Sequence, residues 1–224
     1  VEFYEAYSDF TKGMEMTREL YTKIAEEVYG KTVFEHKGLT FDLKDEWKIY
    51  DFSKIIEEKY NIDVHLATVG EVEEEIIKAG IEYEKKTISV ERGIDLLWKK
   101  VRKELTGPGF LIGIPVYLET LAKKSREDER VVERFQVILA GSEVGKGFSE
   151  LNDPIDQNER FNIQQSLRDA GDEEAQMADD EYVEAMEYGM PPAFGFGVSE
   201  RLFSFLEGKS LRECQAFPLM RKRG

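Results

Sequence analysis

The sequence has a single cysteine, Cys214, and no long apolar stretch. One cysteine cannot form an internal disulfide, which fits a reducing compartment. No run approaches the roughly 20 apolar residues that a membrane-spanning helix requires, so we expect a soluble chain without a membrane partner. The first residues show no signal peptide, and the absence of a methionine before Val1 suggests a fragment of a longer protein.

Basic residues are scarce relative to acidic ones. The 224 residues include 31 Lys and Arg against 46 Asp and Glu, which gives a formal net charge of −15. Nucleic-acid binding requires clustered cations that neutralise phosphates. The composition therefore argues against a free-standing DNA- or RNA-binding protein, and any contact with RNA must be local.

Apolar periodicity predicts a mixture of helices and strands in one large domain or two small ones, with roughly 70% of the unfolded surface buried. Strands are expected at 1–7, 31–37, 39–43, 110–114, 131–139 and 141–150. Helices are expected at 10–30 after a cap at Ser8, and at 52–60, 69–79, 93–105, 154–170, 179–188 and 199–206. The segment 51–106 is interpreted as a helical insertion. This order of elements predicts an α+β fold with antiparallel strands rather than a doubly wound parallel sheet.

Three glycines punctuate the strand-like segment 141–150, a pattern typical of backbone held close to a ligand. Glu143 and Glu150 are seven residues apart in it, so a regular strand would direct them to opposite faces. They share a pocket only if a turn or bulge near Gly145 to Gly147 redirects one of them. Carboxylates in such a place bind Mg²⁺ or an ammonium group, and the alternative is a pair of solvated surface acids.

A second cluster, GFGVSER, spans residues 195–201. Gly195 and Gly197 would let a planar ligand approach the backbone, and Arg201 near a helix start could stack on adenine and pair with a phosphate. No Gly-Lys-Ser/Thr follows, so this is not a Walker phosphate loop. A purely structural turn explains the pattern equally well.

Glu2 and Tyr4 are two residues apart, so they lie on the same face of the first expected strand. A carboxylate that faces a pocket there is costly unless a cation meets it, whereas a frayed terminus would leave Glu2 exposed. His36 and His65 have no acidic or cysteine partners at metal-ligand spacing, so we expect them to be surface or core residues. Cys214 is expected to pack against its neighbours.

Several further segments occur in a fixed order over nearly the whole chain. They are VEFYEAYSD at 1–9, GFSELNDP at 147–154, GDEEAQM at 171–177, YVEA at 182–185, YGMPP at 188–192, GFGVSERL at 195–202 and FPLM at 217–220. Together they resemble the C-terminal half of the catalytic domain of class II lysyl-tRNA synthetases. The resemblance implies an antiparallel sheet flanked by helices.

The resemblance also implies a reaction, in which lysine is joined to ATP with release of pyrophosphate and is then passed to tRNA(Lys). It places Glu150 and Tyr4 on the lysine ammonium, Phe148 in the pocket wall and Glu2 near the bound amino acid. A lysine-specific pocket needs a buried carboxylate that a neutral substrate would leave unpaired. Catalysis would then consist of positioning and charge neutralisation, without a nucleophilic side chain.

The nucleotide site implied by the resemblance uses other residues. Glu143 matches the acid that holds Mg²⁺ on the ATP phosphates, and Gln136 stands where many members have the other metal-binding acid. Arg201 matches the arginine of the third signature motif, which covers the adenine and reaches the terminal phosphate. Lys146 replaces an asparagine that helps to hold the substrate. A cation there favours the amino acid's carboxylate but repels its ammonium, so the direction of Lys146 decides whether the pocket works.

By the same comparison, the first signature motif, most of the second and the anticodon-binding domain are not in this sequence. The resemblance implies a parent enzyme that is cytoplasmic and homodimeric. Because these parts are missing, we expect no lysyl-adenylate formation by these 224 residues alone. Two alternatives remain open. The protein could be a paralogue that attaches lysine to a protein, or a non-catalytic module that binds a partner or senses an amino acid.

Overall fold

The structure, a computed structural model, describes residues 1–83, 88–169, 171 and 175–217. Parts of two segments quoted above, 172–174 and 218–220, lie outside the described residues. Within the described ranges, no helix is long and apolar enough to cross a membrane.

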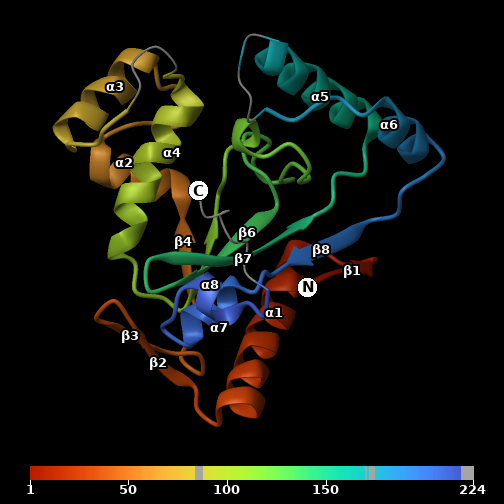
Figure 1. The fold of residues 1–224 in the computed structure, drawn as a ribbon. Helices are drawn as coiled ribbons and strands as arrows, with labels where there is room; N and C mark the ends of the chain where they lie inside the picture. The colour runs from red at the N-terminus through yellow and green to blue at the C-terminus, as the bar shows by residue number, and fades with distance from the viewer. Residues whose placement is uncertain (84–87, 170, 172–174, 218–224) are drawn as a thin grey trace, which may run out of the picture.

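A six-stranded sheet forms the centre of the molecule (Figure 1). In spatial order its strands are β1 (Glu2–Ala6), β8 (Ala193–Gly197), β7 (Ser142–Ser149), β6 (Arg134–Leu139), β5 (Gly109–Ile112) and β4 (Lys48–Asp51). All neighbours are antiparallel except β4 and β5, which are parallel. The expected antiparallel sheet is thus corrected to a mixed one, within an α+β fold. The parallel pair arises because a helical crossover connects β4 to β5.

Helix α1 (Phe10–Ile24) follows β1 after a sharp turn. Its N-cap is Asp9 rather than the expected Ser8, because the Asp9 carboxylate accepts the backbone N–H groups of Thr11 and Lys12 at 2.9 and 3.1 Å. A π-helical turn, η1 (Ala25–Tyr29), extends the helix until Gly30 ends it in the left-handed conformation.

One face of the sheet is covered by α1, by the hairpin of β2 (Val33–His36) and β3 (Leu39–Asp42), and by α7 (Arg201–Leu206), which leads into α8 (Leu211–Cys214) (Figure 1). An aromatic core fills this side. Its largest buried members include Tyr21, Phe34, Phe41, Phe135, Phe194 and Phe196. The predicted hairpin is present, and its strands pair only with each other.

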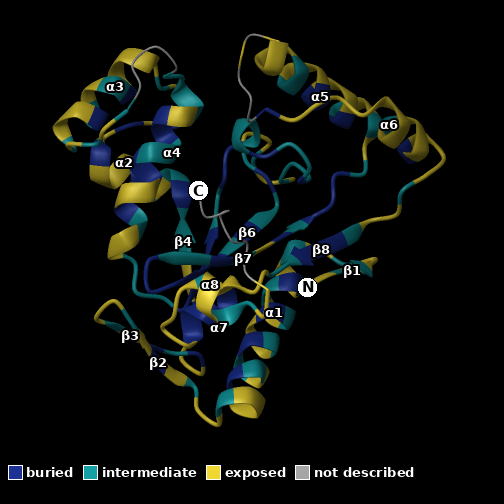
Figure 2. Ribbon diagram, in the orientation of Figure 1, coloured by how far each residue is buried: buried dark blue, intermediate teal, exposed yellow. Residues whose placement is uncertain are grey.

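Three helices pack into a second core, joined to the other face of the sheet. They are α2 (Phe52–Tyr60), α3 (Val69–Lys78) and α4 (Val90–Val101), followed by the 3₁₀ turn η3 (Arg102–Glu104). Ile56, Ile76 and Leu97 are fully buried here, and Leu111 and Ile138 contribute from the sheet. Figure 2 shows that burial concentrates on the sheet and on the inner sides of the helices.

Two helices border the sheet on the side where β7 ends (Figure 1). They are α5 (Pro154–Asp169) and α6 (Asp180–Glu187), and a loop with the 3₁₀ turn η4 (Val116–Leu118) runs between β5 and β6. The carboxylate of Asp179 caps α6 by accepting the Tyr182 N–H at 2.9 Å. These segments form the walls around the pocket described next.

Candidate functional site

An irregularity in β7 gives the sheet a polar face. Gln136 pairs with Lys146 but Ile138 pairs with Glu143, so three residue steps on β7 match two on β6. The extra residue is a β-bulge, and it returns Glu143 to the same face as Lys146. The bulge therefore places Glu143 and Glu150 on one face of the sheet, although their spacing of seven residues would put them on opposite faces of a regular strand.

A cavity of about 480 Å³ opens on this polar face. Seven residues singled out in the sequence line it: Glu2, Tyr4, Lys146, Phe148, Glu150, Gly195 and Gly197. Its other walls are Leu121, Phe161, Gln176, Asp179, Tyr182 and Phe196. The cavity thus lies over β1, β8 and β7 and is closed from the side by α5, α6 and the loop before β6.

Strand register explains why these residues meet. Tyr4 pairs with Gly195, which pairs with Phe148 on its other side. A Cβ at Gly195 would collide with the Glu150 carboxylate and the Tyr4 ring. The glycine therefore makes room for Tyr4 from β1 and for Glu150, which directly follows β7. This is a more specific reason for the glycine than the approach of a planar ligand.

Glu150 is the buried acid of the cavity. It is 8% exposed, and its carboxylate receives no hydrogen bond from the described residues. Its pKa is raised to about 7, mainly by burial and also by the negative charges of Glu2 and Glu119, while the charge of Lys146 lowers it. A buried carboxylate without a paired cation favours a ligand that supplies positive charge.

Tyr4 and Glu2 form a second polar group at the cavity mouth. The Tyr4 hydroxyl donates a hydrogen bond to the Glu2 carboxylate. The pKa of Tyr4 is raised to about 12, mainly by this bond and also by burial and by the charges of Glu2 and Glu150. The hydroxyl therefore remains protonated at neutral pH and holds Glu2 beside the cavity.

Among the described residues that line this cavity, Lys146 is the one cation. Its Nζ lies 3.4 Å from Glu119 Oε2 and 5.4 Å from the centre of the Phe148 ring. The same Glu119 oxygen lies 3.1 Å from Arg134 Nη1. The direction of Lys146, left open by the sequence, is toward Glu119.

The two predicted metal ligands do not line the cavity. Glu143 accepts a hydrogen bond from Trp98 Nε1 at 2.7 Å, and its other oxygen is 3.9 Å from Arg102. Gln136 uses its amide oxygen to accept the Arg134 guanidinium at 2.5 Å.

In the described part of the chain, no group of three or more His, Cys, Asp and Glu side chains is arranged to hold a metal ion. Nucleotide-bound Mg²⁺ often takes only one or two protein carboxylates. Glu143 therefore fits as a single ligand, whereas the engaged oxygen of Gln136 does not.

Arg201 begins α7 and is exposed, and its guanidinium makes no hydrogen bond or ion pair with the described residues. It does not line the cavity either. Of Glu143, Glu150 and Arg201, the structure thus brings only Glu150 into the cavity.

Among the residues that were not identified from the sequence as site residues, four have titratable side chains and lie at or beside the cavity: Tyr182, Asp179, Glu119 and Arg134. Tyr182 and Asp179 lie in or next to a segment already quoted for the resemblance, and burial and the charges of Glu150 and Asp179 raise the pKa of Tyr182. Glu119 and Arg134 carry no motif, because their importance arises from contacts between distant segments.

Comparison with known proteins gives consistent matches. The family model described as tRNA synthetases class II (D, K and N) matches residues 1–221. The chain is 40% identical over 225 residues to a lysine–tRNA ligase of Thermosipho melanesiensis and 38% identical over 226 residues to that of Bacillus subtilis. These matches cover 99% and 100% of this chain but 44% and 45% of the relatives, so it spans less than half of their length.

Proposed function

The chain belongs to the class II tRNA synthetases (D, K and N), and from this premise we propose that its cavity is the lysine pocket of a lysine–tRNA ligase. The observation that carries the proposal is Glu150, a buried carboxylate without a paired cation in a cavity that also contains Glu2 and Asp179. A lysine side chain would place its ammonium against Glu150. A neutral analogue would leave that charge unpaired and would be rejected.

The remaining walls suit the rest of a lysine side chain. Phe148 and Tyr182 supply apolar surface for its methylene groups. The Tyr4 hydroxyl and Glu2 carboxylate add polar groups at the mouth. In this proposal the chain's own residues bind and orient the amino acid, and the geometry rather than a nucleophile accelerates the reaction.

The proposal assigns ATP to the same face of the sheet, with Gly195, Gly197 and Arg201 on the adenine side. Glu143 would hold Mg²⁺ together with the phosphates, and that ion would neutralise charge on the pyrophosphate leaving group. Gln136 is not included, because Arg134 already binds its oxygen. Transfer of lysine to tRNA(Lys) and assembly as a homodimer are proposed on family membership alone.

A second candidate is a module that binds lysine without activating it. The engaged Gln136 and the presence of Lys146 in the cavity favour this alternative. Both candidates share the lysine pocket and differ in whether ATP is used.

Calorimetric titration of the chain with L-lysine and with L-norleucine, its near-isosteric analogue without the ammonium, tests the proposed pocket. We expect lysine to bind and norleucine to bind at least 100-fold more weakly, since the buried charge would stay unpaired. Glu150→Gln should abolish this discrimination. Equal binding of the two amino acids, or no binding of lysine, would contradict the proposal. Titration with ATP then separates the ligase from the module.

A further inference from the structure

Glu119 is nearly buried, at 8% exposed, and has two cationic partners. The same oxygen, Oε2, lies 3.1 Å from Arg134 Nη1 and 3.4 Å from Lys146 Nζ. Arg134 comes from β6 and Lys146 from β7, so Glu119 joins neighbouring strands of the sheet to the loop that precedes them. The three side chains form a short chain of charges beside the cavity.

We propose that Glu119 is a positioning residue that sets the specificity of the cavity, by holding the Lys146 ammonium away from Glu150. Without Glu119, Lys146 would pair with Glu150 itself and take the place of a ligand's ammonium. The inference rests on the proposed lysine pocket, but it concerns residues to which that proposal gives no role.

Lys146 has the reach to occupy the pocket. Its ammonium lies 5.4 Å from the centre of the Phe148 ring, and in the sequence Phe148 lies between Lys146 and Glu150, which directly follows β7. Both charged residues line the same cavity. The side chain of Lys146 is 45% exposed and has a flexible four-carbon stem, and Glu119 is its charged partner among the described residues.

The competition between the two acids is electrostatic. The charge of Lys146 already lowers the pKa of Glu150, against the stronger effects of burial and of neighbouring carboxylates. Two carboxylates, Glu119 and Glu150, therefore act on one ammonium. The pair with Glu119 leaves Glu150 without a cation of its own, which is the condition a cationic ligand needs.

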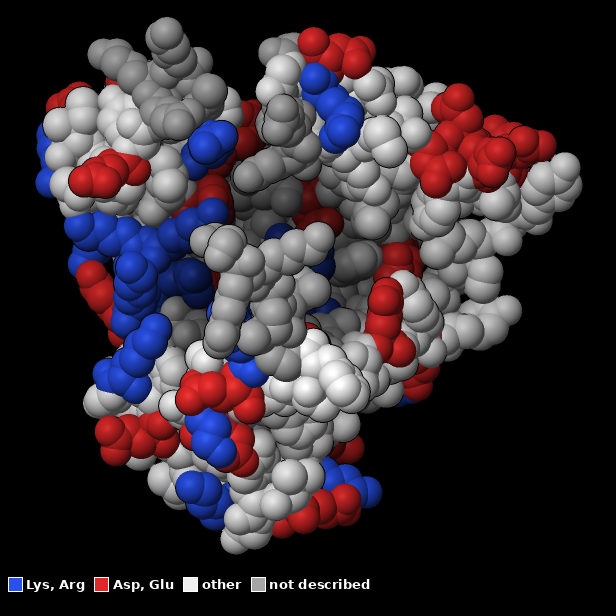
Figure 3. Space-filling model, viewed as in Figure 1, with Lys and Arg blue, Asp and Glu red and all other residues white. Residues whose placement is uncertain are grey.

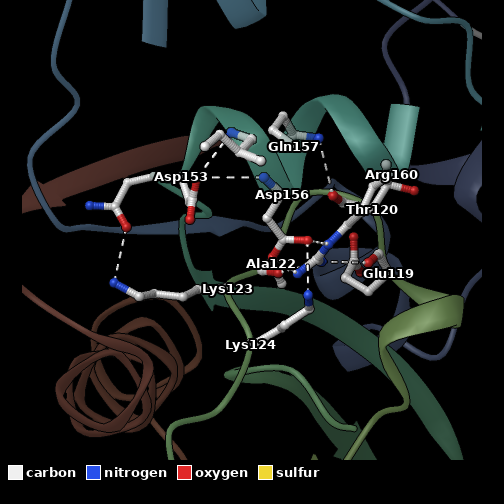
Figure 4. Close-up of polar contacts among 11 residues, drawn as sticks. Glu119, Thr120, Ala122, Lys123, Lys124, Asp153, Asp156, Gln157 and Arg160 are labelled. Carbon is white, nitrogen blue, oxygen red and sulfur yellow. Dashed lines mark hydrogen bonds and ion pairs between the residues drawn. The ribbon is translucent and has the colours of Figure 1, made fainter. Parts of the chain in front are cut away.

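The backbone that carries Glu119 is fixed from α5 (Figure 4). Arg160 Nη1 donates to the carbonyl oxygens of Glu119 and Ala122 at 3.1 and 2.7 Å. The Arg160 guanidinium is in turn held by Asp156, at 2.8 Å, and Asp156 also pairs with Lys124 at 3.1 Å. Because these contacts are made to the main chain, they place the Glu119 side chain without consuming its charge.

The test is a double-mutant cycle read by L-lysine affinity, with wild type, Glu119→Gln, Lys146→Gln and the double variant. We expect Glu119→Gln to weaken lysine binding about ten-fold, because Lys146 is released toward Glu150. Adding Lys146→Gln should restore most of that loss. In the wild-type background, where Glu119 holds Lys146, Lys146→Gln should change the affinity by a smaller factor than it does in the Glu119→Gln background. If Lys146→Gln acts by the same factor in both backgrounds, Lys146 does not depend on Glu119 and the inference is wrong.

A control separates this effect from simple loss of negative charge. Glu127→Gln removes the same charge from an exposed position in the same loop region, and it should leave lysine binding unchanged. Glu119→Asp serves if Glu119→Gln does not fold. It keeps a charge beside Arg134 but shortens the reach to Lys146, and Lys146→Gln should rescue it as well.

A second readout does not require lysine to bind. The pKa of Glu150, measured by carbon NMR of its carboxyl group, should rise more on Lys146→Gln in the Glu119→Gln background than in wild type. An equal rise in both backgrounds overturns the role of Glu119. If wild type fails to bind lysine but the two rises differ, the proposed function fails while the positioning role of Glu119 stands.

Discussion

The side chains of Glu150 and Tyr4 occupy the space above Gly195 that a β-carbon would fill. This is the residue-scale reason for a glycine in the middle of a strand, where it otherwise lowers strand stability. The glycine allows the Glu150 carboxylate to pack directly against the backbone of β8, where it is buried in the cavity. The cost appears in the pKa of Glu150, which burial raises to about 7.

Gly195→Ala tests this packing. The new methyl group would overlap the Glu150 carboxylate and the Tyr4 ring, so we expect a loss of about 1–3 kcal/mol in the free energy of unfolding and a loss of lysine binding. Urea unfolding and calorimetry measure the two effects. Gly197→Ala is the matched control on the same strand, because a β-carbon there meets no atom within 4 Å. Similar lysine affinities in the two variants would show that Gly195 makes no room for the site.

At the scale of elements, the pocket depends on how α5 holds the loop before β6. Arg160 is 6% exposed and binds two backbone carbonyls of that loop as well as Asp156. A buried guanidinium with this many acceptors fixes the spacing between helix and loop. The β7 bulge acts at the same scale, because it alone brings Glu143 to the polar face.

Arg160→Met keeps the apolar length of the side chain but leaves the carbonyls of Glu119 and Ala122 without their donor. We expect the free energy of unfolding to fall by about 3 kcal/mol, as for other buried pairs that lose one partner. Lysine affinity should fall together with it if the loop positions Glu119. Arg126→Met, in the exposed part of the same loop, should change the unfolding free energy by less than about 0.5 kcal/mol. Equal free energies of unfolding for the two variants, measured in urea, would show that Arg160 does not hold the loop before β6.

At the scale of the whole molecule, the sequence predicted what depends on local pattern. The helices predicted at 52–60, 69–79 and 154–170 and the hairpin after Gly30 have clear periodicity and turn residues. They are confirmed as α2, α3 and α5 and as the β2–β3 hairpin, with the described part of α5 ending at Asp169. Strand β4 was missed because it is four residues long and pairs in parallel with a strand about 60 residues later. No local pattern records such a pairing.

Some residues of the candidate site could likewise be predicted from the sequence, and others could not. Alternation places Glu2 and Tyr4 together, and the resemblance adds Phe148 and Glu150, all of which line the cavity. The ion pairs of Glu119 were not predictable, because they join a loop to two strands in a chain with 46 acidic residues. The roles of Glu143 and Arg201 stay predictions.

Glu150 is the carboxylate that a cationic ligand of the cavity would pair with, and titration of its carboxyl group by carbon NMR tests this pairing most directly. Its pKa is raised to about 7, mainly by burial and also by the charges of Glu2 and Glu119, and it is lowered by Lys146. The ionised form attracts an ammonium, so affinity for lysine should increase as the pH rises through 7 and level off above it. Saturating L-lysine should lower the pKa of Glu150 by at least one unit, whereas L-norleucine should leave it near 7. An unchanged pKa with lysine present would contradict the account.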